Sequence, residues 1–304
     1  MASYTIGVDI GGTKIAIGVV DEKGAIHAKT ILPTDHTATP TQMVDRIQQA
    51  IHGMLMDLGP GKEHVLGIGI GVPGPIDKTK GKFLCPPNLP KWANFAVVDE
   101  FQKYFSLPIQ FENDANAATL GEKWIGAAKD NRNFVYITIS TGIGAGLYIN
   151  GGLVSGASGN AGEAGHIVID PGKGTCRCGQ KGCFEWVASG TAIARQGSEL
   201  LGKHVTAKEV FQLYQEGHPA ISSLISEIVT YIGMGCVTLI NLFDPEKIVI
   251  GGGVSEVGEV LFAGIQNYVR QYALSPKGRE TAIVPAALRQ DTGIIGAAAL
   301  IFLR

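Results

Sequence analysis

The sequence has 304 residues, 45% of them hydrophobic, which is enough for one large domain or two moderate ones with hydrophobic cores. A formal net charge of −2 and a charged fraction of 17% give no reason to expect nucleic acid or a membrane surface as a partner. Cysteine usage is also modest, because Cys85 and Cys236 stand alone and the other three are clustered, and this suits a reducing cytoplasm.

The start of the chain lacks the basic segment and apolar core of a signal peptide. No apolar run approaches the roughly 18 residues that span a bilayer. We therefore expect a cytoplasmic protein that is not inserted in a membrane.

The first predicted turn joins strands over residues 4–8 and 15–20 and reads Asp9-Ile10-Gly11-Gly12-Thr13-Lys14. Its glycines expose backbone N–H groups to anionic oxygens, and its hydroxyl and amine side chains add donors. Its aspartate, at a strand end, can hold a hydrated Mg²⁺. The same residues are also common in a bare hairpin turn, so the turn by itself leaves both interpretations open.

The next elements are expected to be a strand over 25–31, a helix over 41–58, a strand over 65–72, a short helix over 97–105 and a strand over 109–111. Glycines alternate along the strand over 65–72 and suggest a close approach to its backbone. The proline-rich loop Cys85–Trp92 carries one amide side chain, Asn88.

Glu112-Asn113-Asp114-Ala115-Asn116 then opens a helix that is expected to run to about Ile125. One interpretation is purely structural, with Asn113 or Asp114 as the N-cap. The other is functional, because acids and amides at a strand end are ligand groups in α/β sheets. A carboxylate there can accept the proton of a substrate hydroxyl within about 3 Å.

A second copy of the first hairpin follows. A strand over 134–139 leads into Ser140-Thr141-Gly142-Ile143-Gly144, and another strand ends at Ile149. In the overlay of the two copies, Val8-Asp9-Ile10-Gly11 falls on Ile139-Ser140-Thr141-Gly142. Such an internal duplication implies two similar domains. Two such turns facing each other across a cleft can hold a triphosphate, which favours phosphate binding over a bare turn.

The stretch from Gly162 to Glu185 combines a histidine with three closely spaced cysteines, and we expect a short strand-like segment over 167–169 between them. Three thiolates and an imidazole form the ligand set of a closed, structural zinc site: His166, Cys176, Cys178 and Cys183. The alternatives are ordinary thiols or a disulfide between the first and last cysteine, which would strand the third. A zinc site would hold Glu163, Glu185 and the histidine ring in place to bind a polyhydroxylated substrate.

The remaining elements are helices over 186–201, 207–216 and 220–242, a strand over 247–250, a helix over 261–272, a strand near 282–284 and a closing helix over 293–302. The strand over 247–250 ends in Gly251-Gly252-Gly253, where a flat or bulky group can lie against bare backbone. The closing helix is nearly all apolar and is expected to be buried.

Taken together, these motifs resemble the ROK family of sugar kinases and repressors. The resemblance covers nearly the whole chain in the right order, and within the family it is greatest to bacterial glucokinases. It implies an α/β fold of the actin-like ATPase type, a duplicated ribonuclease-H-type fold with two domains around a cleft. We expect an N-terminal α/β domain over 1–120 with the first phosphate loop and the catalytic aspartate at its edge. A larger C-terminal domain over 121–304 carries the second phosphate loop, the zinc loop and the adenosine loop, and the final helix can pack back on the first domain.

The resemblance also implies a reaction, the ATP-dependent phosphorylation of a hexose at its 6-hydroxyl. Because the resemblance is greatest to glucokinases, the expected reaction is the conversion of glucose to glucose 6-phosphate, a step of glycolysis. Asp114 would be the general base. The remaining hydroxyls would be bound by Asn88, Asn113, Glu163, His166 and Glu185. Phosphates would be bound by Asp9, Gly11, Gly12, Thr13, Lys14, Ser140, Thr141, Gly142 and Gly144, with Gly251, Gly252 and Gly253 near the adenosine. The implied cofactors are ATP, Mg²⁺ and a structural Zn²⁺ on His166, Cys176, Cys178 and Cys183.

Several alternatives remain open. N-acetylmannosamine and N-acetylglucosamine kinases share the zinc motif, and a fructokinase differs from the pattern mainly in its cysteine spacing. A repressor of this family carries an N-terminal DNA-binding helix-turn-helix, for which a phosphate loop at Asp9 leaves no room. A sugar-binding or regulatory protein without catalysis would not need Asp114. The family resemblance also implies a homodimer or homotetramer.

Overall fold

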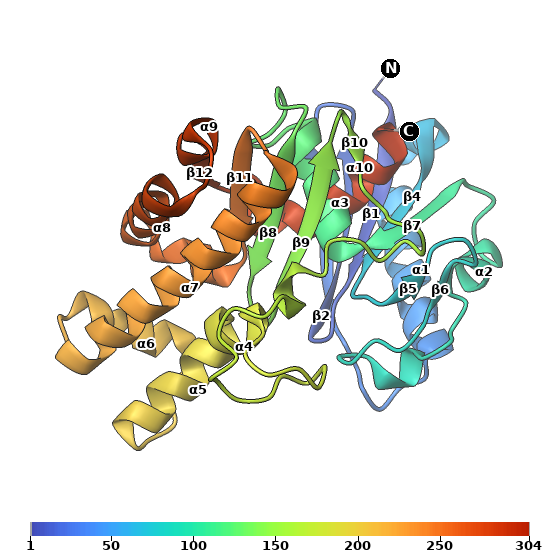
Figure 1. Cartoon of the computed structure of the whole chain (residues 1–304). Helices are drawn as coiled ribbons and strands as arrows, with labels where there is room; N and C mark the ends of the chain where they lie inside the picture. The colour runs from blue at the N-terminus through green and yellow to red at the C-terminus, as the bar shows by residue number, and fades with distance from the viewer. Residues whose placement is uncertain (1, 304) are drawn as a thin grey trace. The chain divides into compact units, whose positions relative to one another are not determined.

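The computed structural model describes residues 2–303 and divides into two compact units. Unit 1 comprises Met1–Lys129, Ser155–Ala161 and Ala287–Arg304, of which residues 1 and 304 lie outside the description. Unit 2 comprises Asp130–Val154 and Gly162–Ala286. Figure 1 shows the ribbon of both units and labels helices and strands where there is room.

Unit 1 is built on a five-stranded sheet in the order β3-β2-β1-β4-β7. Its antiparallel part is β1 (Tyr4–Ile10), β2 (Lys14–Asp21) and β3 (Ile26–Pro33). Its parallel part adds β4 (Val65–Val72) and β7 (Ile109–Asn113). Parallel strands end at the same edge of a sheet, so the residues that follow β1, β4 and β7 are neighbours.

The helices of unit 1 are α1 (Pro40–Asp57), α2 (Val97–Gln102), α3 (Asp114–Trp124) and α10 (Thr292–Phe302), and a small hairpin is formed by β5 (Ile76–Asp77) and β6 (Lys82–Phe83). Local sequence explains α1 well. Thr39 and Gln42 form a capping box, Pro40 occupies the first turn, and the side chains of the helix's apolar face are buried.

Helix α10 packs directly on β1 and β4, and glycines make this contact possible. A Cβ added at Gly7 would lie 2.1 Å from the Ile294 carbonyl oxygen, and one at Gly69 would lie 1.8 Å from that of Ala297. The glycines predicted to allow close approach along β4 therefore admit a helix backbone. The apolar closing helix is buried, as predicted, with Ala297, Ala298 and Ala299 at 0% exposure.

Gly69→Ala is expected to lower the free energy of unfolding by about 1–3 kcal/mol, because the added methyl group overlaps the backbone of α10. Gly53→Ala is a matched control on α1, since a Cβ there has no neighbour within 4 Å and should raise stability by about 0.5–1 kcal/mol. Urea denaturation of both variants measures the difference. Equal midpoints would contradict the packing of α10 on β4.

Unit 2 repeats the topology with a five-stranded sheet in the order β10-β9-β8-β11-β12. The antiparallel strands are β8 (Phe134–Ile139), β9 (Ile143–Ile149) and β10 (Gly152–Leu153), and the parallel ones are β11 (Lys247–Gly251) and β12 (Ala282–Pro285). The predicted duplication is thus present at the level of strand order and direction.

The overlay of the two copies needs a correction. The last cross-strand pair of the first hairpin is Ile10 with Ile15, which leaves four residues in the turn. The last pair of the second hairpin is Ile139 with Ile143, which leaves three residues in the turn. Asp9 pairs with Gly71 on β4, and Thr138 pairs with Gly251 on β11. Asp9 therefore corresponds to Thr138, two positions from the predicted match with Ser140.

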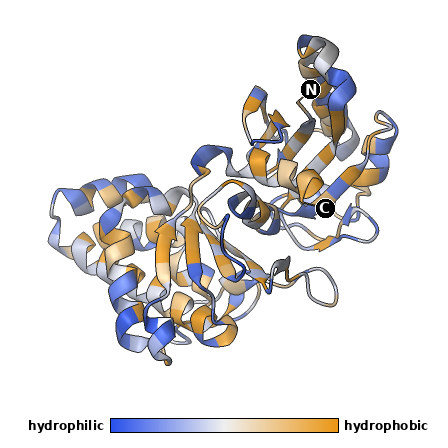
Figure 2. Ribbon diagram, turned by 90° about the horizontal axis from the view of Figure 1, so that it is seen from above, coloured by the Kyte–Doolittle hydropathy of each residue, from blue (hydrophilic) through white to orange (hydrophobic). Residues whose placement is uncertain are grey.

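The helices of unit 2 are α4 (Phe184–Ala188), α5 (Gly190–Leu201), α6 (Ala207–Gln215), α7 (Pro219–Phe243), α8 (Glu259–Tyr272) and α9 (Pro276–Arg279). Short 3₁₀ helices complete the chain at Gly59–His64, Pro90–Trp92, Ala164–His166, Gly253–Val257 and Arg289–Asp291. In Figure 2 the strands are mostly hydrophobic, whereas the helices alternate between hydrophobic and hydrophilic residues, as expected for helices with one face on a sheet.

Two local predictions are wrong. The single helix expected over 186–201 is two helices, because Ser189 is extended and its hydroxyl caps α5 by accepting the Ala192 N–H. The segment 167–169 is not a strand, and only an isolated bridge joins Val168 to Cys183.

The expectation that no apolar run approaches 18 residues concerned continuous runs, and one helix has the length and mean composition of a membrane span without such a run. Helix α7, with 25 residues, is long and apolar enough on average to cross a membrane. Serine, threonine and glycine are interspersed along it and interrupt any continuous apolar run. However, 56% of its most apolar window is buried inside the protein. Ile225, Ile228 and Ile232 belong to the core of unit 2, so α7 is a core helix.

Candidate functional site

The first predicted phosphate turn, Asp9–Lys14, is held by hydrogen bonds within unit 1. The Gly11 N–H donates to the Lys14 carbonyl at 3.0 Å, and the Thr34 hydroxyl donates to the Gly11 carbonyl at 2.7 Å. The His36 Nε2 donates to the Gly12 carbonyl at 2.8 Å. Because these carbonyl groups have donors inside the protein, the turn keeps its shape without a ligand.

The same turn lies against the loop that carries Asn88. A Cβ added at Gly12 would lie 2.9 Å from the Asn88 Cβ, so only glycine fits this approach. Asn88 itself is exposed. The structure therefore brings together a predicted phosphate-binding residue and a predicted sugar-binding residue.

Asp9 lies at the end of β1 with its carboxylate against the first turn of α10. A Cβ added at Gly293 would lie 2.1 Å from Asp9 Oδ2, so a glycine is needed there. Burial raises the pKa of Asp9 to about 6, and the nearby Lys14 charge offsets part of this rise. The role of Gly293 was not predicted, because it depends on a contact with a residue 284 positions earlier.

Asn113 and Asp114 stand at the junction of β7 and α3. Asn113 is the N-cap, as one interpretation predicted, and its Oδ1 accepts the N–H groups of Ala115 and Asn116 at 2.9 and 3.2 Å. Asp114 Oδ1 also accepts the Ala115 N–H, at 2.8 Å. The carboxylate is thus held at a helix N-terminus, which favours negative charge.

This junction lies at the same sheet edge as Asp9. Gly71 on β4 pairs with Asp9 on one side and with Glu112 on the other. A Cβ added at Gly71 would lie 3.9 Å from the Asp114 Cα. Unit 1 therefore places both aspartates at the carboxyl edge of its parallel strands.

Glu112 holds Asn113 in place. It is part of the Glu112–Asn116 motif, but it was not among the predicted site residues. Its side chain is 1% exposed and accepts the Asn113 N–H and the Asn116 Nδ2 at 3.0 Å each. Lys78 Nζ pairs with its other oxygen at 2.5 Å. The partner lies 34 positions away, so local sequence could not identify it.

The second predicted phosphate turn, Ser140–Gly144 in unit 2, contacts several other segments. The Gly190 N–H at the start of α5 donates to the Ser140 carbonyl at 2.7 Å, and the Ile143 N–H donates to Glu185 Oε2 at 2.9 Å. A Cβ added at Gly142 would lie 2.3 Å from the same carboxylate oxygen. Glu185 thus has one oxygen bound to the turn itself.

The glycine loop Gly251–Gly253 contacts the same region. Gly252 has a φ of 85°, and a Cβ there would lie 2.4 Å from the Ile139 carbonyl oxygen, just before the turn. The Ser255 hydroxyl donates to the Gly252 carbonyl at 2.7 Å. At Gly253, by contrast, a Cβ would have no neighbour within 4 Å, so one side of the loop is open.

Segment 163–166 packs on the start of β9. A Cβ added at Gly165 would lie 2.1 Å from the Ile143 carbonyl oxygen. The His166 N–H donates to the Glu163 carbonyl at 3.0 Å, and Glu163 is exposed. Unit 2 therefore gathers Glu163, His166 and Glu185 around the second turn, whereas Asn88, Asn113 and Asp114 belong to unit 1.

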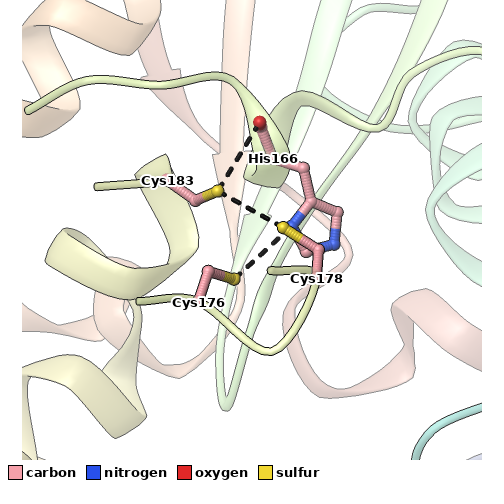
Figure 3. Close-up of side chains that lie close together, drawn as sticks. All are labelled: His166, Cys176, Cys178 and Cys183. Carbon is pink, nitrogen blue, oxygen red and sulfur yellow. Dashed lines mark hydrogen bonds between the residues drawn. The ribbon is translucent and has the colours of Figure 1, made fainter. Parts of the chain in front are cut away.

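The predicted metal ligands form one cluster, drawn in Figure 3. The ligand atoms of His166, Cys176, Cys178 and Cys183 all lie within 4.8 Å of one another. Cys176 Sγ is 3.7 Å from His166 Nδ1, and Cys178 Sγ is 3.5 Å from Cys183 Sγ. All cysteines in residues 2–303 are free, so the alternative of a disulfide between the first and last cysteine is absent from the structure.

The thiols of this cluster differ in acidity. A hydrogen bond from the Gln180 N–H lowers the pKa of Cys178 to about 7, whereas burial raises the pKa of Cys183 to about 12. Three sulfurs and an imidazole nitrogen at this spacing fit a tetrahedral zinc ion, which binds thiolates.

The cysteine loop is tied to α7 by a polar network on its other side. The Tyr231 hydroxyl lies 2.9 Å from Asp170 Oδ2 and 2.8 Å from Glu227 Oε1. Lys173 Nζ donates to the same Glu227 oxygen at 2.9 Å. Burial, together with the two carboxylates, raises the pKa of Tyr231 far above its usual value, so the phenol stays a donor.

Tyr231→Phe is expected to lower the free energy of unfolding by about 1–3 kcal/mol, because two carboxylates lose their shared donor. Tyr272→Phe, on an exposed side chain of α8, is the matched control and should change nothing. Chemical denaturation followed by tryptophan fluorescence compares them. Equal stability of the two variants would show that the network does not anchor the loop.

Comparison with known proteins gives a consistent result. A model of the ROK family matches residues 5–303. A glucokinase of Halalkalibacterium halodurans is 35% identical over 96% of this chain and 93% of its own. The structure of a ROK hexokinase from Thermus thermophilus has a TM-score of 0.83 at 32% identity, covering 99% of this chain and 98% of that one. A ROK family glucokinase from Streptomyces griseus, solved with glucose and AMPPNP, has a TM-score of 0.82 at 34% identity, covering 99% of this chain and all of that one.

Proposed function

Since the chain belongs to the ROK family, we propose that it is a kinase that transfers the γ-phosphoryl group of ATP to the 6-hydroxyl of glucose. The predicted actin-like, duplicated α/β fold is confirmed. The observation that carries the proposal is the carboxyl edge of the unit 1 sheet, where Asp9, Asn113 and Asp114 gather beside the phosphate turn. The names of the relatives, and glucose with AMPPNP in one of them, support the choice of substrates.

Asp114 is the proposed general base. As the sugar oxygen forms a bond to the γ-phosphorus, the bond from that phosphorus to the β–γ bridging oxygen breaks. The hydroxyl proton passes to a carboxylate oxygen of Asp114. The Ala115 N–H holds this carboxylate in place, so little reorganisation is needed at the moment of transfer.

The other site residues position the substrates. Asn113 keeps its amide N–H groups for the sugar, because its oxygen caps α3. The remaining proposed sugar contacts are Asn88, Glu163, His166 and Glu185. Backbone N–H groups and side chains of Asp9–Lys14 and Ser140–Gly144 bind phosphate oxygens, and Gly251–Gly253 offer bare backbone to the adenosine.

The residues present fit Mg²⁺ at Asp9. The partly buried Asp9 carboxylate has a raised pKa because desolvation disfavours its charged form, and this supports a cation beside it. When bound, Mg²⁺ neutralises charge that develops on the phosphate oxygens. The main task of Asp9 is therefore to hold a cation beside the turn.

The cysteine cluster fits a structural zinc ion, and its four ligands leave no open position for catalysis. Its residues hold the substrate contacts in place. Cys183 is the N-cap of α4, whose first turn carries Glu185, and His166 follows Glu163 by three residues.

We also propose that the protein is a cytoplasmic, glycolytic enzyme that binds neither nucleic acid nor membrane. It is proposed to assemble as a homodimer or homotetramer, and light scattering can test this oligomeric state.

The proposed function is tested by a coupled assay with ATP and Mg²⁺ on glucose, mannose, fructose, N-acetylglucosamine and N-acetylmannosamine. The highest kcat/KM is expected for glucose. Preference for an acetamido sugar or for fructose would change the substrate and keep every residue role. Absence of turnover with all five would overturn the kinase proposal and favour a sugar-binding or regulatory protein.

A further inference from the structure

A cavity of about 650 Å³ in unit 1 has no part in the proposed reaction. It lies between the β5–β6 hairpin, α2 and β7, which is the edge strand of the sheet. Cavities of 300–1,000 Å³ are the usual size for small-molecule sites. The polar residues that line this one are Lys78, Thr79, Lys80, Lys82, Asp99, Gln102 and Gln110.

The charged residues that line the cavity are mostly lysines. Three lysines line it against one carboxylate, that of Asp99. The carboxylates paired with two of these lysines do not line the cavity. Glu112 is buried behind Lys78, and Asp77 is 3.9 Å from the Lys80 amine. The lining itself therefore carries more lysines than carboxylates, which favours an anion with more than one charge.

The hairpin that carries the lysines is firmly placed. Asp77 pairs with Lys82 across the hairpin, and the Val98 N–H at the start of α2 donates to the Gly81 carbonyl at 3.1 Å. Gly81 has a φ of 57°, and a Cβ there would lie 2.5 Å from the Val98 Cβ. The backbone that carries the three lysines is thus held in place by these contacts.

The rest of the cavity suits a ligand larger than a bare anion. Gln102 on α2 and Gln110 on β7 offer amide groups, and Val98 and Phe111 add apolar surface. A phosphate monoester, with a charge of about −1.5 to −2 at pH 7, matches both the ammonium wall and these neutral groups. A single carboxylate would use only part of the charge.

We propose that this lysine pocket binds the phosphoryl group of a small phosphorylated metabolite and that its occupancy is communicated to Asn113 and Asp114 through Lys78 and Glu112. Lys78 lines the cavity, and its amine pairs with the buried Glu112, which also accepts the Asn113 N–H. An anion that draws this amine away leaves Glu112 charged and unpaired, at a cost. Occupancy therefore lowers kcat, a consequence that rests on the proposed function.

Binding is tested first, without turnover. Inorganic phosphate and glucose 6-phosphate are each titrated by calorimetry into the whole protein with saturating glucose, so that the proposed sugar site is filled. The pocket variant is Lys80→Gln/Lys82→Gln. The matched control, Lys203→Gln/Lys208→Gln, removes the same charge from exposed lysines of unit 2. Asn88→Ala removes a proposed sugar contact and leaves the pocket intact.

The pocket variant should weaken anion binding by about 10-fold or more, because it loses two charged contacts, while both other variants bind like the wild type. If glucose 6-phosphate binds more tightly than inorganic phosphate, the ligand of the site is a phosphate ester. If the two bind equally, the ligand is free phosphate. Unchanged binding in the pocket variant, or loss in Asn88→Ala instead, overturns the proposal.

The coupling is tested second, by kinetics. Inorganic phosphate, as the bound anion, should lower the kcat of the wild type and leave the kcat of the pocket variant unchanged. Equal inhibition of both proteins would overturn the coupling. A protein without kinase activity would refute the proposed function and leave the calorimetric result standing.

Discussion

Asp114→Asn is expected to lower kcat by roughly 10²–10⁴, the range for the loss of a general base, with a much smaller effect on glucose affinity. The amide keeps an oxygen that can accept the Ala115 N–H, so the start of α3 is preserved. It cannot take the proton of the sugar hydroxyl. Steady-state kinetics with glucose and ATP measure the effect, and binding of glucose by calorimetry separates affinity from turnover.

Asp114→Ala should lose a similar factor in kcat and some stability as well, since it also removes the hydrogen bond to the Ala115 N–H. Asp57→Asn is a control in the same unit, because Asp57 is exposed at the end of α1 and lies outside both the proposed catalytic site and the lysine-lined cavity. Near-normal turnover of Asp114→Asn would refute the assignment of the base, whatever the behaviour of the alanine variant.

Cys178→Ser is expected to lose bound zinc and to lower the free energy of unfolding by more than about 4 kcal/mol, the range of lost metal sites. The cluster supplies four ligands, and a serine hydroxyl does not replace a thiolate. Because Glu163, His166 and Glu185 lie on segments held by the cluster, kcat/KM should also fall. Metal analysis, urea denaturation and kinetics are measured on the same preparation.

The matched control is Cys85→Ser, which removes an exposed thiol of unit 1 that is remote in sequence from the cluster. It should keep zinc content, stability and turnover. A Cys178→Ser protein that is free of zinc and yet as stable and active as the wild type would show that no metal is needed. Removal of metal from the wild type by a chelator should reproduce the properties of Cys178→Ser.

The order of the elements was predictable because it depends on local patterns. The capping residues and apolar face of α1 lie within one stretch of chain, and so do the β-branched strands and the glycine-rich turns. The break at Ser189 was missed because apolar residues continue on both sides of it, although its hydroxyl and extended backbone form the cap of α5. The turn overlay was two residues off because cross-strand pairing, and not sequence similarity, determines which residues correspond.

By itself, the sequence determined the duplicated strand pattern, the set of three cysteines and one histidine, and the motifs that resemble one family, since each is carried by residues close together in the chain. Only the tertiary structure decided which distant groups meet. Lys78 pairs with Glu112. Gly293 has no Cβ and so leaves room for the Asp9 carboxylate, and the glycines of β1 and β4 leave room for the backbone of α10 in the same way. Such contacts join residues from 34 to nearly 290 positions apart, and they depend on how strands and helices pack, which no local pattern encodes.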